Sequence, residues 1–534
     1  MIKTKVFQRV IIFSLFLIFL CIAFWPAISS YYAYHDDVIF FLRTSTRPEA
    51  PGTLFNLSIG RFIGAHLYMA MGFLINSIDD LKGVRFLGVV NLAFCALILF
   101  FWLRKKFFSS RNAFLLSLAV FTLPSFQIAV SQTAMTYQPV SILFAIGAFS
   151  SAYRISLSDK IVRRIFNGRF VLSVFLFFCA LSTYKPTAMF YWTMAGLVVL
   201  FSEFKDFSEI KNRMINLFSP AIVSLGLYVL VLRLIKPYFS RFNLWGYNPY
   251  ALTTDYFGKI GWFLREPLVN ALNLWNIFPY KIAAAVGVTF VISAIALEVL
   301  RQQKEERIEF FINGFVRSSI LIILSLLSFL PNLVSSQSIF YYRCAGPLTV
   351  LVFFIFIWSA RAWIQFIFQN RQRIVFSIAL LLLSFYGVVQ AHQTILNYRV
   401  VPSQKEIQFV KDQMAKVNIN EYEKIYFVQP EERYLKNRGD EFGNLTTVYS
   451  HNMVGLVSCL LREVAKGTME VFHINFDPST KMVLYIFRDI NDEKQMYRYQ
   501  IKVDSGVASE KPSSFQEKTL VIDMRRFEDR EEGT

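Results

Sequence analysis

The 534-residue chain lacks several features by which enzymes and binding proteins are often recognised. It has no glycine-rich phosphate loop, no internal repeat with a period of about 20 to 50 residues and no low-complexity tract. Its five cysteines have no metal-like spacing, and no nucleic-acid-binding motif is present. We therefore predict no nucleic-acid partner and no metal cofactor, with a divalent cation as the open alternative.

Charged residues are scarce as well, at 17% of the chain. In contrast, 55% of the residues are hydrophobic and 17% are aromatic, with 57 Phe, and the mean hydropathy is +0.43. A chain this apolar cannot be one soluble core and must use lipid as its solvent. The composition predicts an all-α, polytopic membrane protein that contacts membrane lipids over most of its length.

Long apolar runs show where the chain crosses the bilayer. A helix needs close to 20 apolar residues to cross roughly 30 Å of hydrocarbon, and by this measure we expect about eleven transmembrane helices. The runs lie at residues 10–28, 84–103, 113–130, 140–153, 170–184, 186–201, 215–235, 282–300, 318–334, 348–363 and 374–391.

Clusters of Lys and Arg fall in alternate loops between these runs, as short cytoplasmic loops require. The first run follows three basic residues and has no good small-residue cleavage site, so we expect an uncleaved signal-anchor and a cytoplasmic N-terminus. The outer regions are then 29–83, 236–281, 331–346 and everything after about residue 392. The net charge of +18 is explained by topology and contact with anionic lipids.

The composition becomes charged and mixed from about residue 402. Apolar alternation predicts strands and helical patterns predict two helices in this part of the chain. The strands are expected at 424–428, 469–476, 481–487, 497–503 and 519–524, and the helices at 405–416 and 454–465. Residues 1–400 would thus form the transmembrane module, and residues 401–534 a small extracytoplasmic α/β domain that recognises an acceptor or acts as a lid.

An acidic dyad, Asp36-Asp37, follows His35 just beyond the first apolar run. Two carboxylates beside a bilayer resist desolvation, so we expect them to serve chemistry or a cation. Neighbouring residues of a helix point about 100° apart, so one acid would face a reaction centre while the other pairs with Arg43, Arg61 or a cation. The plainer alternative is a helix N-terminus that is capped and stabilised by acids.

Asp255 and Glu266 lie in the long outer loop, 236–281. They could supply a second carboxylate for an acceptor or a metal ion. The aromatic residues of the same loop suit sugar stacking, but anchoring at the membrane interface explains them better.

Several short motifs of the outer regions together resemble a known enzyme class. They are Asp36-Asp37 after the first span, Arg43 and Gly60-Arg61 in the same loop, Tyr184-Lys185-Pro186 ahead of a span, and Pro331 to Arg343 ahead of a late span. In this arrangement the chain resembles the GT-C class of integral-membrane glycosyltransferases, most closely the bacterial GtrII-like glucosyltransferases. The similarity covers the organisation of residues 1–400.

The resemblance implies an inverting transfer of a hexose, glucose above all, from a polyprenyl-phosphate donor to a surface glycan on the outer side of the plasma (inner) membrane. Asp36 would be the general base, since a sugar hydroxyl needs a carboxylate within about 3 Å to accept its proton, and Asp37 the supporting acid. The resemblance leaves open which aspartate has which role. His35, Arg43 and Tyr184 would support them.

Positive charge must bind the donor phosphate, and arginine offers a fork of donors that matches it. The expected residues are Arg61, Arg343 and Lys185. Lys185 departs from the family, in which Gln often stands at this position. Arg343 could instead anchor at the interface beside two tyrosines, and Arg61 could pair with the dyad.

Two other functions remain open. A flippase or transporter of a lipid-linked saccharide would share the polytopic body, but it is expected to carry ionisable groups near mid-membrane. Here the charges gather at the outer edge. The sequence also does not distinguish a GT-C-like glycopolymer ligase or a protein mannosyltransferase from a glucosyltransferase.

Overall fold

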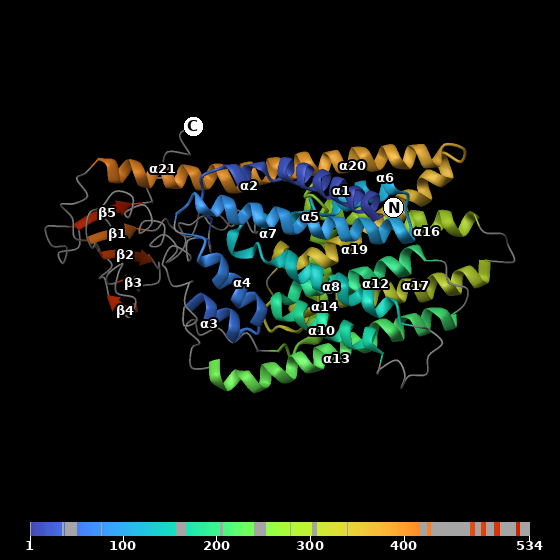
Figure 1. Cartoon of the computed structure of the whole chain (residues 1–534), viewed down its shortest axis with the longest axis horizontal. Coiled ribbons are helices and arrows are strands. Elements are labelled where there is room, and N and C mark those ends of the chain that lie inside the picture. The colour runs from blue at the N-terminus through green and yellow to red at the C-terminus, as the bar shows by residue number, and fades with distance from the viewer. Residues whose placement is uncertain are drawn as a thin grey trace.

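The computed structural model describes residues 2–34, 37, 51–75, 77–155, 167–202, 207–239, 252–277, 279–301, 307–338 and 340–416, together with five strands further on. Long helices dominate this part of the chain and run along the longest axis of the molecule (Figure 1). Shorter helices lie between the long ones. In chain order, all the helices of the described residues are α1 (Ile2–Ala23), α2 (Trp25–Ser29), α3 (Pro51–Ser58), α4 (Phe62–Gly72), α5 (Asp80–Lys106), α6 (Ser110–Val120), α7 (Pro124–Ser131), the 3-10 turn η2 (Thr133–Met135), α8 (Gln138–Tyr153), α10 (Gly168–Thr183), α11 (Lys185–Ala188), α12 (Phe190–Phe201), α13 (Phe207–Phe239), α14 (Tyr256–Arg265), α15 (Pro267–Leu272), α16 (Tyr280–Arg301), α17 (Arg307–Leu327), α18 (Leu330–Val334), α19 (Tyr342–Ile367), α20 (Gln372–Ile395), the π turn η4 (Leu396–Val400) and α21 (Val401–Ala415).

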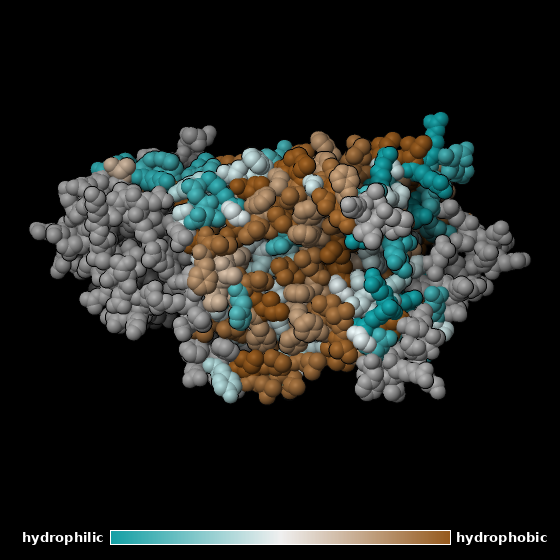
Figure 2. Space-filling view, in the orientation of Figure 1, coloured by the Kyte–Doolittle hydropathy of each residue, from teal (hydrophilic) through white to brown (hydrophobic). Residues whose placement is uncertain are grey.

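A broad apolar band crosses the middle of the face shown in Figure 2, and hydrophilic residues flank it on both sides. Many large side chains in the band are exposed, among them Phe175 at 60% and Phe385 at 69%. Such a surface is unstable in water and is stable against lipid tails. The chain is therefore a multi-pass membrane protein, as its composition predicts.

Six of the described helices are long and apolar enough to cross a bilayer, or seven if the bent pair α6 and α7 counts as one span. Three shorter apolar helices accompany them. The figure of about eleven spans stays a prediction. One reason for the lower count is that some apolar runs are broken: the run at 113–130 bends by 62° ahead of Pro124, and the run at 186–201 is divided at Met189. At the first of these breaks, Pro124 lacks the N–H and restricts the residue before it, which favours the end of a helix.

Glycines bring two of the short helices close to the bundle. Gly60 has a φ of +81° and ends the turn after α3, a conformation that L side chains rarely adopt. A Cβ at Gly64, in α4, would collide with the backbone carbonyl of Thr183 at the end of α10. Together they place the start of α4, and with it Arg61, against the end of α10.

The five strands are β1 (Lys424–Val428), β2 (Glu470–Asn475), β3 (Met482–Phe487), β4 (Met496–Ile501) and β5 (Thr519–Asp523), and they form one sheet in the order β4-β3-β2-β1-β5. β1 pairs in parallel with β2 and β5, while β3 is antiparallel to β2 and β4. Each strand lies where apolar alternation predicts it, and α21 covers most of the predicted helix at 405–416. The predicted helix at 454–465 lies outside the described residues, and a separate extracytoplasmic domain stays a prediction.

Candidate functional site: a buried acid and a cluster of cations

Asp37 forms a fully buried ion pair with Arg85 of α5. The Arg85 Nη2 lies 2.7 Å from the Asp37 Oδ2, and both side chains are 0% exposed. The same carboxylate accepts hydrogen bonds from the backbone N–H of Tyr34, at 3.3 Å, and from that of Ala134 in η2, also at 3.3 Å. Donors from three separate segments therefore fix the position of this carboxylate.

Two tyrosines before the dyad form cation–π contacts with arginines. The Arg85 guanidinium carbon lies 3.6 Å from the centre of the Tyr32 ring, and that of Arg399 lies 3.7 Å from the centre of the Tyr34 ring. Burial raises the pKa of Tyr32 to about 12, so its phenol keeps its proton, which it donates to the carbonyl of Ser131 at 2.8 Å. The segment before Asp37 is thus held by cation–π contacts and hydrogen bonds.

The expected partners of the dyad need one correction. Sequence reasoning gave Arg43, Arg61 or a cation as the partner of the second acid, whereas Asp37 pairs with Arg85. His35, Asp36 and Arg43 lie outside the described residues, so the roles predicted for them stay predictions. Neither Arg85 nor Arg399 was singled out from the sequence. An arginine at the end of a span that is predicted to face outward departs from the positive-inside pattern, and this feature could have revealed Arg85.

The three predicted phosphate ligands come together at the turn between α10 and α12. The Arg61 guanidinium carbon lies 4.5 Å from the centre of the Tyr184 ring, and Lys185 is the next residue. The charge of Arg343 acts on both Arg61 and Tyr184. Within the described residues, no carboxylate forms an ion pair with Arg61 or Lys185.

Neutral groups hold Arg61 in place. Its Nη1 donates to the Asn56 Oδ1 at 3.2 Å and to the Tyr137 hydroxyl at 3.3 Å. Its Nε is buried and has no hydrogen-bond partner among the described residues. A buried donor of a charged group without an acceptor is costly, so the site favours an anion that supplies one.

Lys185 lies at the turn between α10 and α12, outside the helices long enough to span the membrane. Its Nζ lies 5.9 Å from the centre of the Tyr228 ring, and the Tyr228 hydroxyl donates to the carbonyl of Gly60 at 3.0 Å. Burial and then the nearby Arg61 charge lower the pKa of Lys185 to about 8. An anion at this position would offset the repulsion between the two cations.

The segment Ala134 to Tyr137 connects the acid to the cations. Ala134 donates to Asp37, and three residues later Tyr137 accepts from Arg61. One short segment of chain thus contacts the buried acid through a backbone N–H and the cation cluster through the Tyr137 hydroxyl.

A cavity of about 400 Å³ lies beside Tyr31. Its walls are Tyr31, Gln404, Lys405, Ile407, Gln408 and Lys411. The Lys411 Nζ lies 4.6 Å from the centre of the Tyr31 ring. The amide groups of Gln404 and Gln408 can form hydrogen bonds with a polar ligand, and Tyr31 adds an aromatic ring to the same lining.

Asp255 and Glu266 form hydrogen bonds with residues of their own stretch of chain. Asp255 caps α14 through a 2.7 Å hydrogen bond from the Gly258 N–H, and Glu266 accepts from the Trp262 indole at 2.6 Å. These are structural roles that the sequence did not predict. Across the described part of the chain, no group of three or more His, Cys, Asp or Glu could hold a metal ion.

Comparison with known proteins assigns no family. No protein-family model matches the chain, and no curated protein matches it.

Proposed function

We propose that this protein is a membrane glycosyltransferase of the GT-C type that transfers a hexose, glucose above all, from a polyprenyl-phosphate donor to a cell-surface glycan. The observation that carries the proposal is the convergence of Arg61, Lys185 and Arg343 beside the segment that also holds Asp37. An acid next to a cluster of cations suits a reaction that takes a proton from one group and releases a phosphate from another.

The cations would bind the phosphate of the donor and stabilise it as it leaves. A polyprenyl phosphate is anionic, and Arg61 presents a guanidinium whose Nε has no acceptor among the described residues. In the reaction the bond between the anomeric carbon and the phosphate oxygen breaks, and the electron pair stays on the phosphate. Preformed positive charge around that oxygen lowers the barrier.

The two acids would divide the work. Asp37 already accepts hydrogen bonds from Arg85 and two backbone N–H groups, so it is suited to positioning the loop. Asp36 would then be the general base, taking the proton of the acceptor hydroxyl as its oxygen attacks the anomeric carbon with inversion. No metal ion is needed in this scheme.

The cavity beside Tyr31 would receive the acceptor glycan. Gln404 and Gln408 offer amide groups to the hydroxyls of a sugar, and Tyr31 and Ile407 line the same cavity. The C-terminal strands would extend this surface on the outer side of the plasma membrane, with the N-terminus in the cytoplasm.

The test is transfer of glucose from a short-chain polyprenyl-phosphate glucose to an envelope glycan by the purified protein in detergent. Transfer that is lost in Asp36→Asn, with binding of the donor retained, supports the proposal. If the unmodified protein binds the lipid but neither transfers nor hydrolyses its sugar with any donor, the proposal is wrong and a flippase becomes the better explanation.

A further inference from the structure

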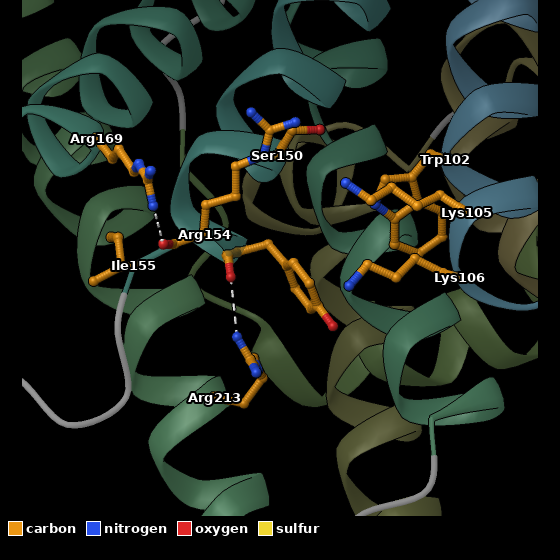
Figure 3. A pocket seen from close by; sticks show the side chains of 9 residues that line it. Trp102, Lys105, Lys106, Ser150, Arg154, Ile155, Arg169 and Arg213 are labelled. Atoms are coloured by element: carbon orange, nitrogen blue, oxygen red, sulfur yellow. Dashed lines mark hydrogen bonds between the residues drawn. The ribbon is translucent and has the colours of Figure 1, made fainter.

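A second group of cations lies at the opposite end of the bundle. The last turn of α5, the end of α8, the start of α10 and the first half of α13 enclose an open cavity of about 510 Å³ (Figure 3). Its nine lining residues are Trp102, Lys105, Lys106, Ser150, Tyr153, Arg154, Ile155, Arg169 and Arg213. Five are cations and none is acidic, and the volume is within the range of about 300 to 1,000 Å³ that is typical of ligand pockets.

Backbone and aromatic groups orient these cations. Arg169 donates to the Arg154 carbonyl at 2.6 Å, and Arg213 donates to the Tyr153 carbonyl at 3.0 Å, as the dashed lines in Figure 3 show. Lys106 and Arg213 both lie over the Tyr153 ring, at 4.7 and 4.5 Å from its centre. Carbonyls at a helix C-terminus attract cations but leave their positive charge uncompensated.

Within the described residues, no carboxylate forms an ion pair with any of the five cations. Positive charges held close together without an anion repel each other, so the cavity favours a ligand with negative charge. Arginine and lysine side chains that can donate from several directions are suited to a phosphate group.

The surface next to the cavity indicates where that phosphate comes from. On α5, Ile98 is 39% exposed and lies two helical turns before Lys105, on the same face. On α10, Leu172 and Phe175 are 47% and 60% exposed and follow Arg169 by three and six residues. Exposed apolar residues therefore run from the cations toward the middle of the membrane on two of the helices that line the cavity. A headgroup in the cavity could leave its acyl chains along them.

We propose that this cavity is a binding site for the phosphate headgroup of an anionic phospholipid. Trp102 lines it, and an indole at this depth suits the boundary between headgroups and acyl chains. The site does not depend on the glycosyltransferase proposal, because it lies at the far end of the helices from Asp37 and Arg61. It would fix the bundle in the leaflet that carries anionic lipid.

The test measures quenching of Trp102 by lipids with brominated acyl chains in nanodiscs that contain the full-length protein. Brominated phosphatidylglycerol is compared with brominated phosphatidylcholine, and Trp102→Phe identifies the part of the signal that comes from this residue. We expect phosphatidylglycerol to quench Trp102 at much lower mole fractions. Equal quenching by the two lipids would overturn the proposal.

Charge variants sharpen the result. Lys105→Gln with Lys106→Gln should weaken phosphatidylglycerol binding about 10- to 30-fold, because the cavity loses two charged donors to the phosphate. Arg371→Gln with Arg373→Gln removes the same charge from exposed positions at the start of α20, near the same end of the bundle. These two residues are not in the cavity lining, and salt screens exposed charges at a distance, so binding should change less than about twofold. Equal loss in both variants would mean a general charge effect. If pyrophosphate occupies the cavity as tightly as the lipid does, the ligand is a soluble phosphate compound and the lipid assignment is wrong.

Discussion

Arg85 and Asp37 are 48 residues apart in the sequence, yet they form an ion pair in which neither side chain is exposed to solvent. Taking both charges out of water is costly, and only their mutual attraction and the added hydrogen bonds offset that cost. Removing one partner leaves the other buried and unpaired. The pair therefore fixes the loop that carries the acidic dyad to the start of α5.

The first prediction is that Arg85→Gln destabilises the protein strongly, by about 3–5 kcal/mol, because the Asp37 carboxylate loses its ion-pair partner. The measurement is thermal unfolding of the purified protein in detergent. The double variant Arg85→Gln with Asp37→Asn should recover part of the loss, since both charges are then absent.

Lys82 and Asp79 provide the control for this prediction. They form an ion pair at 2.5 Å on the surface of the same region, where the side chains are 31% and 64% exposed. Lys82→Gln should cost less than about 1 kcal/mol, because water screens such a pair. Equal losses for Arg85→Gln and Lys82→Gln would mean that the buried pair does not hold the loop.

The second prediction separates the two aspartates. Asp36→Asn should lower glycosyl transfer by about 10²- to 10⁴-fold, the usual range for a general base, without lowering the thermal stability. Asp37→Asn should lower stability and activity together, because its carboxylate accepts from Arg85 and from two backbone N–H groups. Transfer rates at matched folded protein distinguish the two. A stable, inactive Asp37→Asn would exchange their roles.

Elements that depend on local pattern could be predicted from the sequence. The helices α16, α19 and α20 contain the apolar runs expected for them, and the strand β1 (Lys424–Val428) has the predicted bounds. Both follow from hydropathy and alternation within a single segment. The breaks ahead of Pro124 and at Met189 were missed, because apolar composition continues through each break and does not reveal it.

The site was predictable only in part, because sequence patterns are local and the site depends on contacts between distant segments. Arg61, Lys185 and Arg343 were chosen for the chemistry of phosphate binding, and they do come together in space. The partnership of Asp37 with Arg85 depends on how α5 packs beside the segment Tyr32 to Tyr34, which no short motif reveals. The cavity lined by Lys105, Lys106 and Arg213 was not predicted either. In the sequence its basic residues resemble the Lys and Arg clusters that are expected in any cytoplasmic loop.

The third prediction concerns pH. The pKa of Lys185 is lowered to about 8, so its ammonium is charged below that pH and neutral above it. Binding of a polyprenyl phosphate should therefore weaken as the pH rises through about 8. Lys185→Arg should keep binding constant from pH 7 to 9, because arginine stays charged up to about pH 12. Fluorescence titration with a labelled polyprenyl phosphate measures the effect.

Two further variants test the cause of this pH dependence. Lys185→Gln should bind weakly at every pH. Arg61→Gln should move the midpoint upward, because the Arg61 charge is one of the two causes that lower the pKa of Lys185. A midpoint near pH 8 that persists in Lys185→Gln would assign the titration to another group.

The last prediction tests whether close packing of α4 positions Arg61. Gly64→Ala places a methyl group against the backbone carbonyl of Thr183, which cannot move aside as a flexible side chain can. Overpacking of this kind costs about 1–3 kcal/mol, and here it also displaces the helix that begins one residue after Arg61. We expect weaker binding of the polyprenyl phosphate than in the unmodified protein.

Gly83→Ala is the matched control for Gly64→Ala. Gly83 lies in α5, and a Cβ there meets nothing within 4 Å. It should leave binding unchanged, because alanine is the better helix former and no neighbour is disturbed. If Gly64→Ala binds the lipid as Gly83→Ala does, the approach of α4 to α10 does not set the position of Arg61.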